Sequence, residues 1–327
     1  MLKNQYLNKL TTLKIGWVIP QVLSYSKVMA STRLRVYDVI RYLKSINIKS
    51  GLYISFFRYD IVIFQKAFSK KFISLAKKLK NKNTKIIFDI NVNYIDSDDL
   101  LVTLQQQKDI REMLKISDAV IVPSSFLKDL YSKYNNNVYL IEEIIEERFF
   151  KIRKEHLDKN DISLVFCGYA VKSKEIYLIK DVLKYLYEKY NVKLILISEK
   201  DPKLNIIPYK FYKYNHKIIP QLLLKGDIAI SPRDISRRYN LGHSFTRIGY
   251  PMAVGLPVVA SPVPSYTGSP AILCNNQEEW KNELEKLIKN YEYRKEISEL
   301  GIRFVWDNFS KDKILDKYKN LFITMCL

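Results

Sequence analysis

The sequence predicts an α/β protein with two Rossmann-like domains, each built on a parallel sheet. Apolar runs of strand length alternate with segments of helical spacing along most of the 327 residues. This alternation is typical of parallel strands joined by helices, and the chain is long enough for two such domains. Parallel sheets bind ligands at the carboxyl ends of their strands, so we look for functional residues there.

The first part of the chain contains apolar runs that predict the strands of one sheet. Pro20 ends the first run, and Ser31 or Thr32 is expected to cap the first helix. The second helix is amphipathic and carries lysines on its outer face. The predicted strands are 14–19, 60–64, 85–90, 119–122 and the less regular 138–145, and the predicted helices are 32–45, 68–79 and 101–115.

The second part repeats the alternation after a densely charged stretch, 151–161, which reads as a domain linker. We therefore predict domains at 1–150 and 151–305, with a tail helix at 306–327. The predicted strands are 164–167, 193–198, 228–231 and 258–260, and the predicted helices are 175–189, 220–224, 247–254, 278–289 and 293–304.

The most informative segment is 244–261, which reads SFTRIGYPMAVGLPVVAS. Its helical half is followed by the turn Gly255-Leu256-Pro257 and an apolar strand. Ser244 and Thr246 are candidate caps of the helix. Arg247 lies in the first turn, where the helix dipole disfavours a cation, so an anion such as a phosphate is expected beside it. The alternative is an ordinary crossover with a surface arginine.

Several segments together resemble GT-B glycosyltransferases of the group 1 type. The run 249–261 is similar to the donor-site helix and strand of that family. Four other segments agree in order along the chain, namely 117–125, 163–168, 226–232 and the tail from 309 to 322. The resemblance implies two Rossmann-like domains facing across a cleft, with a final helix that crosses back to the N-terminal domain.

The resemblance also implies a donor site in the second domain. Arg247 takes the place of a basic residue that holds the donor diphosphate. The family's two glutamates, eight residues apart, are replaced here by Gly242 and Tyr250. The tyrosine hydroxyl is expected to hydrogen-bond the ribose. The predicted catalytic residues are Arg247, Lys172 and His243, and the predicted donor-binding residues are Gly168, Tyr169, Lys174, Ser231, Arg233, Ser244 and Tyr250.

Residues of the first domain are expected to face the acceptor. Ser31, Arg33 and Arg35 open the helix after the first strand, where such a fold brings a helix N-terminus to the cleft. Asp89 ends a strand and resembles an acidic strand-end position of related enzymes. These four residues are the predicted acceptor or cleft residues.

We predict no metal and no cofactor other than the nucleotide sugar, which is the donor substrate. The triplet Asp96-Ser97-Asp98 matches an Asp-X-Asp metal signature, but acids before a helix are expected as caps. The cysteines Cys167, Cys274 and Cys326 have no metal-ligand spacing, and their odd number fits a reducing compartment. No apolar signal or membrane-spanning segment is evident, so a cytoplasmic protein is expected.

The positive charge is concentrated in the first quarter of the chain. Residues 1–85 contain 18 lysines and arginines against Asp38 and Asp60 alone, so they carry +16 of the net +20. Such asymmetry predicts a polyanionic partner, for example a membrane surface, a lipid phosphate or nucleic acid. The basic helix 68–79 is favoured as a solvated helix face, and it is also the best candidate for peripheral contact with lipid.

These observations favour a glycosyltransferase that moves a sugar from a nucleotide-diphosphate sugar to an acceptor hydroxyl. The resemblance implies a retaining, metal-independent reaction, and the basic first domain favours a lipid-linked acceptor or an anionic glycan at the membrane surface. One alternative is a nucleic-acid-modifying glucosyltransferase of the same fold. Another is a non-catalytic binding or scaffold protein, which the two replaced glutamates favour.

Overall fold

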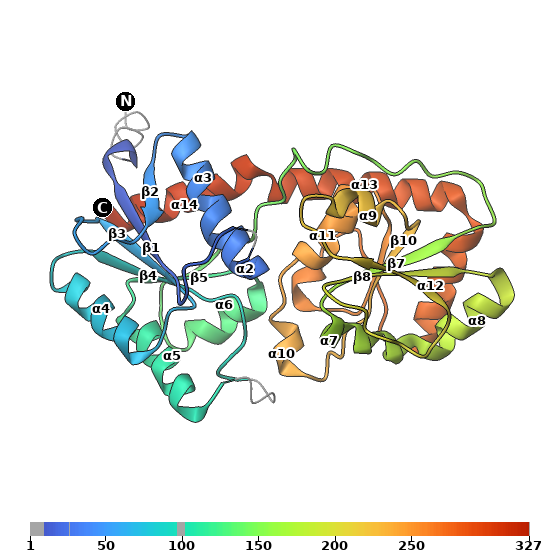
Figure 1. The fold of residues 1–327 in the computed structure, drawn as a ribbon, viewed down its shortest axis with the longest axis horizontal. Helices are drawn as coiled ribbons and strands as arrows, with labels where there is room; N and C mark the ends of the chain where they lie inside the picture. Colours follow the sequence, from blue (N-terminus) through green and yellow to red (C-terminus); the bar gives the residue numbers. More distant parts are fainter. Residues whose placement is uncertain (1–9, 26, 97–101, 327) are drawn as a thin grey trace. The chain divides into compact units, whose positions relative to one another are not determined.

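The computed structural model describes residues 10–25, 27–96 and 102–326, and the chain divides into two compact units (Figure 1). Unit 1 comprises Met1–Ile144, Gly242–Ser244 and Lys311–Leu327. Unit 2 comprises Ile145–Leu241 and Phe245–Ser310. Each unit contains one six-stranded sheet in which every strand pair is parallel, so the predicted fold class is confirmed.

The sheet of unit 1 has the strand order β2-β1-β3-β4-β5-β6. The inner strands are almost wholly buried because their sequences are continuous apolar runs, as in the IVIF of β3. The strands are β1 (Lys14–Val18), β2 (Lys49–Leu52), β3 (Ile61–Gln65), β4 (Lys85–Asp89), β5 (Ala119–Val122) and β6 (Val138–Leu140).

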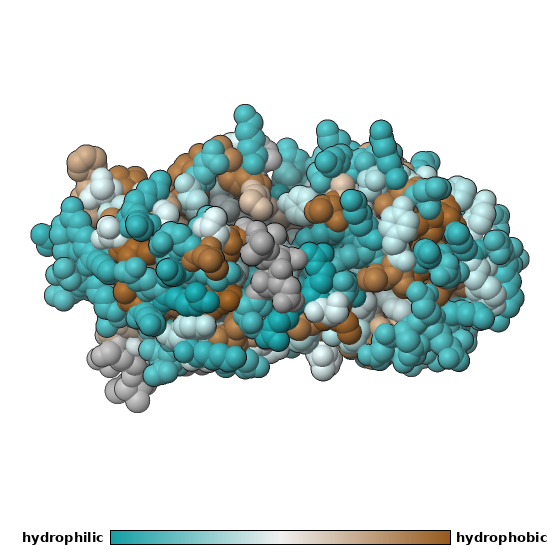
Figure 2. All heavy atoms as spheres, turned by 90° about the horizontal axis from the view of Figure 1, so that it is seen from below, coloured by the Kyte–Doolittle hydropathy of each residue, from teal (hydrophilic) through white to brown (hydrophobic). Residues whose placement is uncertain are grey.

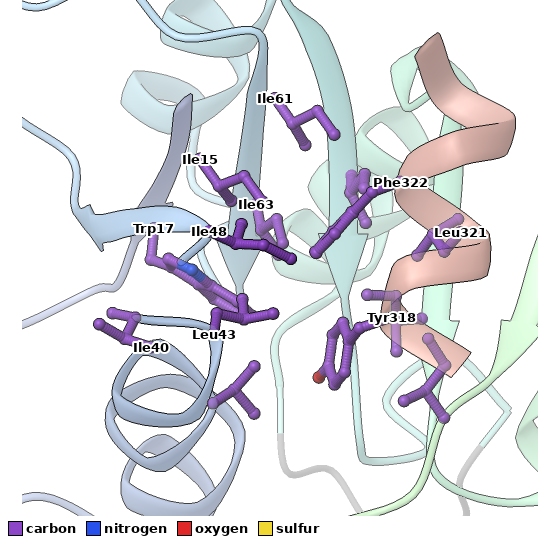
Figure 3. Close-up of a cluster of buried hydrophobic side chains, with 14 of the residues drawn as sticks. Ile15, Trp17, Ile40, Leu43, Ile48, Ile61, Ile63, Tyr318, Leu321 and Phe322 are labelled. Carbon is purple, nitrogen blue, oxygen red and sulfur yellow. The ribbon is translucent and has the colours of Figure 1, made fainter. Parts of the chain in front are cut away.

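Helices cover both faces of this sheet, and a separate apolar core forms on each. On one face, Tyr318, Leu321 and Phe322 of the last helix, α14, pack with Trp17 of β1 and Leu43 of α3 (Figure 3). Trp17 is fully buried and its indole N–H donates to Ser50 Oγ at 2.9 Å. The helices are α2 (Ala30–Thr32), continued by a π-helical turn (Arg33–Tyr37), α3 (Asp38–Ser45), α4 (Lys70–Lys80), α5 (Leu104–Ile116), α6 (Ser125–Ser132) and α14 (Lys311–Cys326).

The sheet of unit 2 has the order β12-β11-β10-β7-β8-β9. One of its cores contains side chains from α9, α11 and α13, and the other contains side chains from α8 and α12. The strands are β7 (Ser163–Cys167), β8 (Lys193–Ser198), β9 (Tyr209–Lys213), β10 (Ile228–Ser231), β11 (Val258–Ala260) and β12 (Ile272–Leu273).

The helices of unit 2 begin with a composite segment that the sequence predicts as one helix. It consists of α7 (Ala170–Ser173), a 3₁₀ segment (Lys174–Ile179) and α8 (Lys180–Tyr190). The remaining helices are α9 (Ile219–Leu223), α10 (Arg238–Leu241), α11 (Thr246–Ala253), α12 (Gln277–Lys289) and α13 (Tyr291–Phe309), with a short 3₁₀ turn at Pro264–Tyr266.

Three predicted helix starts are wrong. The N-cap of α11 is Phe245, which makes no side-chain capping bond, so neither Ser244 nor Thr246 is the cap. The first helix begins at Ala30, and the hydroxyl of Ser31 accepts a hydrogen bond from Lys66 instead of capping. Helix α5 begins at Leu104, three residues after the predicted start, and Thr103 caps it through a capping box with Gln106. Ser97 and Asp98 of the proposed acidic cap lie outside the described residues.

Figure 2 shows one face of the molecule, on which hydrophilic residues dominate and hydrophobic residues form separate patches. Within the described ranges, none of the helices has the length and apolar character that a bilayer span requires. Several large apolar side chains are nevertheless exposed, and the most exposed of these is Phe56 at 93%.

Candidate functional site

Each sheet has a point at which its strand order reverses, and such points are the usual ligand sites of parallel α/β sheets. In unit 2 the chain runs from β7 outward through β8 to β9 and then returns to β10 on the other side of β7. In unit 1 the reversal lies between β1 and β3. Polar and charged residues gather at the carboxyl ends of both strand pairs.

In unit 2 this place is occupied by an arginine site, by which we mean Arg233, Arg247, Ser231 and Glu175. Ser231 ends β10, and its hydroxyl accepts a hydrogen bond from Nε of Arg247 at 3.1 Å. The guanidinium of Arg247 also lies over the ring of Phe166 in β7, 4.8 Å from the ring centroid. The predicted donor residues Arg247, Ser231 and Arg233 are therefore brought together.

The second arginine is held by a carboxylate that the sequence did not point to. Nη1 of Arg233 pairs with Glu175, whose other oxygen accepts from Asn240 Nδ2 at 2.6 Å. The backbone N–H of Arg233 donates to Ser261 Oγ at 2.8 Å. These contacts fix a side chain that is only 1% exposed.

Several buried polar atoms of this site have no hydrogen-bond partner among the described residues. They are Nε and Nη2 of Arg233, Nη2 of Arg247 and the hydroxyl of Tyr266. Buried polar groups without partners are costly and uncommon, and they call for a ligand or water. All of these nitrogens are donors, so a complementary ligand must supply acceptor atoms.

The electrostatics of the arginine site favour an anion. Burial, together with the nearby charge of Arg233, lowers the pKa of Arg247 from its ordinary 12.5 to about 10. Two arginines thus face each other's charge in a partly buried place, and Glu175 is paired with Arg233. An anionic ligand with several oxygens would relieve the repulsion and satisfy the free N–H groups.

The remaining predicted donor residues differ in their positions. Gly168 follows β7 directly, and a Cβ atom there would lie 2.8 Å from Nη2 of Arg247, so only a glycine lets this guanidinium keep its present position. Lys172 lies over the ring of Tyr239, 5.4 Å from its centroid, while Tyr169 and Lys174 are exposed. The ring of Tyr250 packs against Phe150. His243 and Ser244 belong to unit 1 by their contacts.

Unit 1 has a lysine site at its own strand reversal, formed by Ser31, Thr32, Gln65 and Lys66. Lys66 follows β3 with φ at 52°, a left-handed conformation that is rare for a lysine. Its Nζ donates to Ser31 Oγ at 3.1 Å, and Thr32 Oγ1 donates to Gln65 Oε1 at 3.3 Å. Nε2 of the buried Gln65 has no partner among the described residues.

Arg35 and Asp89 meet inside unit 1. Nε of Arg35 donates to both carboxylate oxygens of Asp89, at 2.8 and 3.1 Å, and the two side chains are 1% and 0% exposed. Nη1 of Arg35 also reaches the carbonyl of Ile141 at 3.1 Å and Glu143 at 3.4 Å. Arg33 instead lies over the ring of Tyr25, at 5.9 Å from the centroid.

The comparisons with known proteins agree on the architecture. No protein-family model matches the chain, and no curated protein matches it in sequence. Solved structures do match: Anabaena HepE in complex with UDP and glucose has a TM-score of 0.70 at 13% identity, over 95% of this chain and 100% of that one. The chain has the GT-B fold. The fold that the sequence resemblance implied is thereby confirmed.

Two further GT-B structures are similar over almost the whole chain. A glycosyltransferase from Rickettsia africae has a TM-score of 0.68 at 14% identity, covering 96% of this chain and 99% of that one. The T4 alpha-glucosyltransferase in complex with UDP and a 13-mer DNA has a TM-score of 0.65 at 12% identity, covering 96% and 100%. At these identities the likeness defines the GT-B fold.

Proposed function

We propose that the chain is a glycosyltransferase that takes a sugar from a nucleoside-diphosphate sugar and transfers it to an acceptor hydroxyl. The observation that carries this proposal is the arginine site at the strand reversal of unit 2, where two arginines hold donors that no described residue partners. A diphosphate supplies several anionic oxygens in a small volume, and arginine forks match their geometry.

The same two arginines would supply the catalysis. In the transfer, the bond from the anomeric carbon to the diphosphate oxygen breaks and the acceptor oxygen bonds to that carbon. The hydroxyl proton passes to the released diphosphate. Negative charge grows on the diphosphate as the bond breaks, and fixed cations that are already partly desolvated stabilise it most strongly at that stage.

We propose UDP as the nucleotide because HepE and the T4 alpha-glucosyltransferase hold UDP on the same fold. We also propose that the reaction retains the anomeric configuration, as the family resemblance implies. We further propose that the reaction needs no metal, since Arg233 and Arg247 carry the charge that the departing diphosphate requires. Product analysis by NMR tests the stereochemistry. Unchanged turnover in the presence of a metal chelator would support metal independence, and a loss of turnover that added metal restores would refute it.

The lysine site of unit 1 is our proposed acceptor site. Its unpartnered amide Nε2 and its half-buried ammonium group suit an acceptor that carries hydroxyl groups together with an anionic group. This fits a glycan or lipid-linked acceptor, and a cytoplasmic location at the membrane surface remains part of the proposal. Ser31, which the sequence singled out, contributes its hydroxyl here, whereas Lys66 and Gln65 were not expected.

Lys66 is expected to titrate far below the other lysines. Burial lowers its pKa from the ordinary value of 10.5 to about 8, and the charge of Arg35 acts in the same direction, against the attraction of Asp89. The ammonium is therefore charged below pH 8 and loses its proton above it, so binding of an anionic acceptor should weaken above pH 8. NMR of ε-¹³C-labelled lysine should show one resonance with this midpoint.

The resonance is assigned to Lys66 by its absence from the spectrum of the Lys66→Arg variant. This substitution also keeps a positive charge at the site. In this variant the binding of an anionic acceptor should not weaken above pH 8, because arginine stays protonated. If every lysine of the unaltered protein titrates near 10.5, the proposed environment of Lys66 is wrong.

A nucleic-acid acceptor is the second candidate function. The T4 enzyme of the same fold is seen with DNA, and the first quarter of this chain is strongly basic. Duplex binding that falls by orders of magnitude with rising salt would favour it. A non-catalytic binding protein is the third candidate, and it predicts UDP binding without turnover.

The deciding experiment is a thermal-shift and calorimetric screen of UDP, GDP, CDP, ADP and their sugars. A ligand at 100 times its dissociation constant stabilises the folded state by about 2.7 kcal/mol, which is easily detected. Stabilisation by a nucleoside diphosphate, followed by slow release of the nucleotide from its sugar, would support a transferase. The absence of any stabilisation would contradict the donor site.

A further inference from the structure

The connection between β2 and β3 contains no helix. Parallel strands are normally joined through a crossover of about a dozen residues or more, usually with a helix. Here the two strands lie on opposite sides of β1, yet only Tyr53–Asp60 joins them, with neither helix nor strand in between. We call these residues the aromatic loop. Beside it lies an open cavity of about 1510 Å³.

The aromatic loop is held firmly at its base. The ring of Tyr59 packs on Gly16 of β1, where a Cβ atom would lie only 3.0 Å from the ring. The hydroxyl of Tyr59 accepts a hydrogen bond from the N–H of Ile54 at 3.0 Å. The backbone carbonyl of Tyr59 accepts one from Thr84 Oγ1 at 3.0 Å. The rings of Tyr53 and Tyr59 are 5.3 Å apart. The conformation of the loop is therefore set by contacts with the sheet.

The tip of this fixed loop presents apolar side chains to water. Phe56 is 93% exposed, Phe57 is 62% exposed and Ile54 is 49% exposed. Single exposed apolar residues are ordinary, but adjacent phenylalanines on an ordered tip are not explained by the packing of unit 1. The two phenylalanines form an exposed apolar tip, and both line the cavity.

Five cations and one acid are among the described residues that line the cavity. Within the described part of the chain, none of its five lysines and arginines forms an ion pair, and Asp60 is the single acid in its lining. Asp60 is itself engaged by the backbone N–H of Lys14 at 2.8 Å. The five cations are Lys14, Arg58, Lys78, Lys82 and Lys85.

The contrast within helix α4 is informative. Lys77 pairs with Glu112 of α5 at 2.5 Å, and Lys80 pairs with Asp118 at 3.0 Å. Lys78, which lines the cavity on the same helix, has no such partner in the described chain. Part of the outer face that the sequence suggested for lipid contact is therefore neutralised within the unit, whereas Lys78 brings a charge without an ion pair in the described chain to the cavity beside the aromatic loop.

We propose that the aromatic loop and its five cations form a binding surface for an anionic lipid bilayer. Phe56 and Phe57 enter the interfacial region, and the lysines and Arg58 contact anionic headgroups. A bilayer accounts for both halves of the surface, because interfaces favour aromatic anchors and attract nearby cations. A nucleic-acid duplex would use the cations but leave the apolar tip in water.

This surface extends the proposed function by bringing a transferase to lipid-linked acceptors, but it is tested without sugar transfer. Full-length protein is co-sedimented with phosphatidylcholine vesicles that contain phosphatidylglycerol, and with phosphatidylcholine vesicles alone. We expect binding to the anionic vesicles that decreases with added salt. Phe56→Ser and Phe57→Ser should each lower the partition coefficient about 10-fold, and each of Lys78→Gln, Lys82→Gln and Lys85→Gln about fivefold.

Matched controls carry the same chemical changes elsewhere. Leu104→Ser removes an apolar side chain that is 73% exposed at the start of α5. The triple variant Lys180→Gln, Lys184→Gln, Lys200→Gln removes three charges from exposed positions of unit 2, whereas each cavity variant removes one. Both should partition like the unaltered protein. UDP binding by every variant is measured in parallel, so failure of the donor site and failure of the membrane surface remain distinguishable.

The proposal is overturned if the protein ignores vesicles, or if it binds neutral and anionic vesicles equally. It is also overturned if the phenylalanine variants bind as well as the controls. Salt-sensitive binding of a DNA or RNA duplex, lost in the cavity lysine variants while vesicles are ignored, would assign the surface to nucleic acid instead.

Discussion

Replacing Arg247 with alanine is expected to weaken UDP binding by about 10- to 150-fold. The estimate corresponds to the loss of one hydrogen-bonded, charge-assisted contact, worth about 1.5–3 kcal/mol. Arg247 offers an unpartnered Nη2, and its Nε is already fixed by Ser231, so the fork is oriented before a ligand arrives. Isothermal titration calorimetry with UDP measures the effect directly.

The same substitution is expected to leave the ligand-free protein as stable as before, or to stabilise it slightly. Burial and the charge of Arg233 lower the pKa of Arg247 to about 10 from its ordinary 12.5, so the charged form is disfavoured by folding. Residues kept for binding commonly cost stability in this way. Thermal denaturation without UDP should therefore show no loss, and equal losses of stability and binding would contradict a role in ligand contact.

Two comparisons separate charge from geometry. Arg247→Lys keeps the charge but not the fork, so it should recover only part of the affinity. Gly168→Ala places a methyl group 2.8 Å from the present position of Nη2, and the flexible guanidinium should move away. Its binding should fall between those of Arg247→Ala and the unaltered protein. Arg303→Ala, an exposed arginine of α13, is the neutral control.

The central strands and the edge strand β6 could be predicted from the sequence, whereas the edge strands β2, β9 and β12 could not. Strands such as β3 and β5 are buried on both faces and appear as continuous apolar runs. The edge strands β2, β9 and β12 were missed because they are short or polar, as in the KSGL of β2 and the YKFYK of β9. An edge strand has a neighbour on one side only and is less buried, so its sequence does not need to be apolar.

The donor site was predictable only where the residues themselves carry a local signal. Arg247 was recognised because a cation is unusual in the first turn of a helix. Glu175 was missed because it lies in what looks like an ordinary amphipathic segment, and its partners Arg233 and Asn240 are 58 and 65 residues away. Those contacts exist only after β7 and β10 have paired, so no spacing rule reveals them.

The residues of unit 1 near the proposed acceptor site could not be predicted from the sequence for a similar reason. Lys66 adopts a left-handed conformation that sequence patterns assign to glycine or asparagine, so nothing in the Gln65-Lys66-Ala67 run signals a functional turn. Arg35 was expected to face a ligand because it follows a candidate cap. Its partner Asp89 lies 54 residues further along, and only the folded sheet makes the two a buried pair.

Arg35→Met is expected to destabilise unit 1 by about 3–5 kcal/mol, the usual effect of removing one partner of a buried ion pair. The substitution keeps most of the volume but leaves Asp89 and Glu143 buried without their guanidinium, at 0% and 4% exposure. A typical domain is stable by only 5–15 kcal/mol, so the effect is a large part of the total. Denaturant unfolding measures it.

The double variant Arg35→Met, Asp89→Leu should regain part of this loss, because replacing both partners of a buried pair by apolar groups is often close to neutral. The coupling between the two substitutions follows from a double-mutant cycle. A loss below about 1 kcal/mol for Arg35→Met would mean that the pair behaves like an exposed one. A large loss with unchanged UDP binding would assign Arg35 and Asp89 to the folding of unit 1, and it would leave Lys66 and Gln65 as the residues that meet an acceptor.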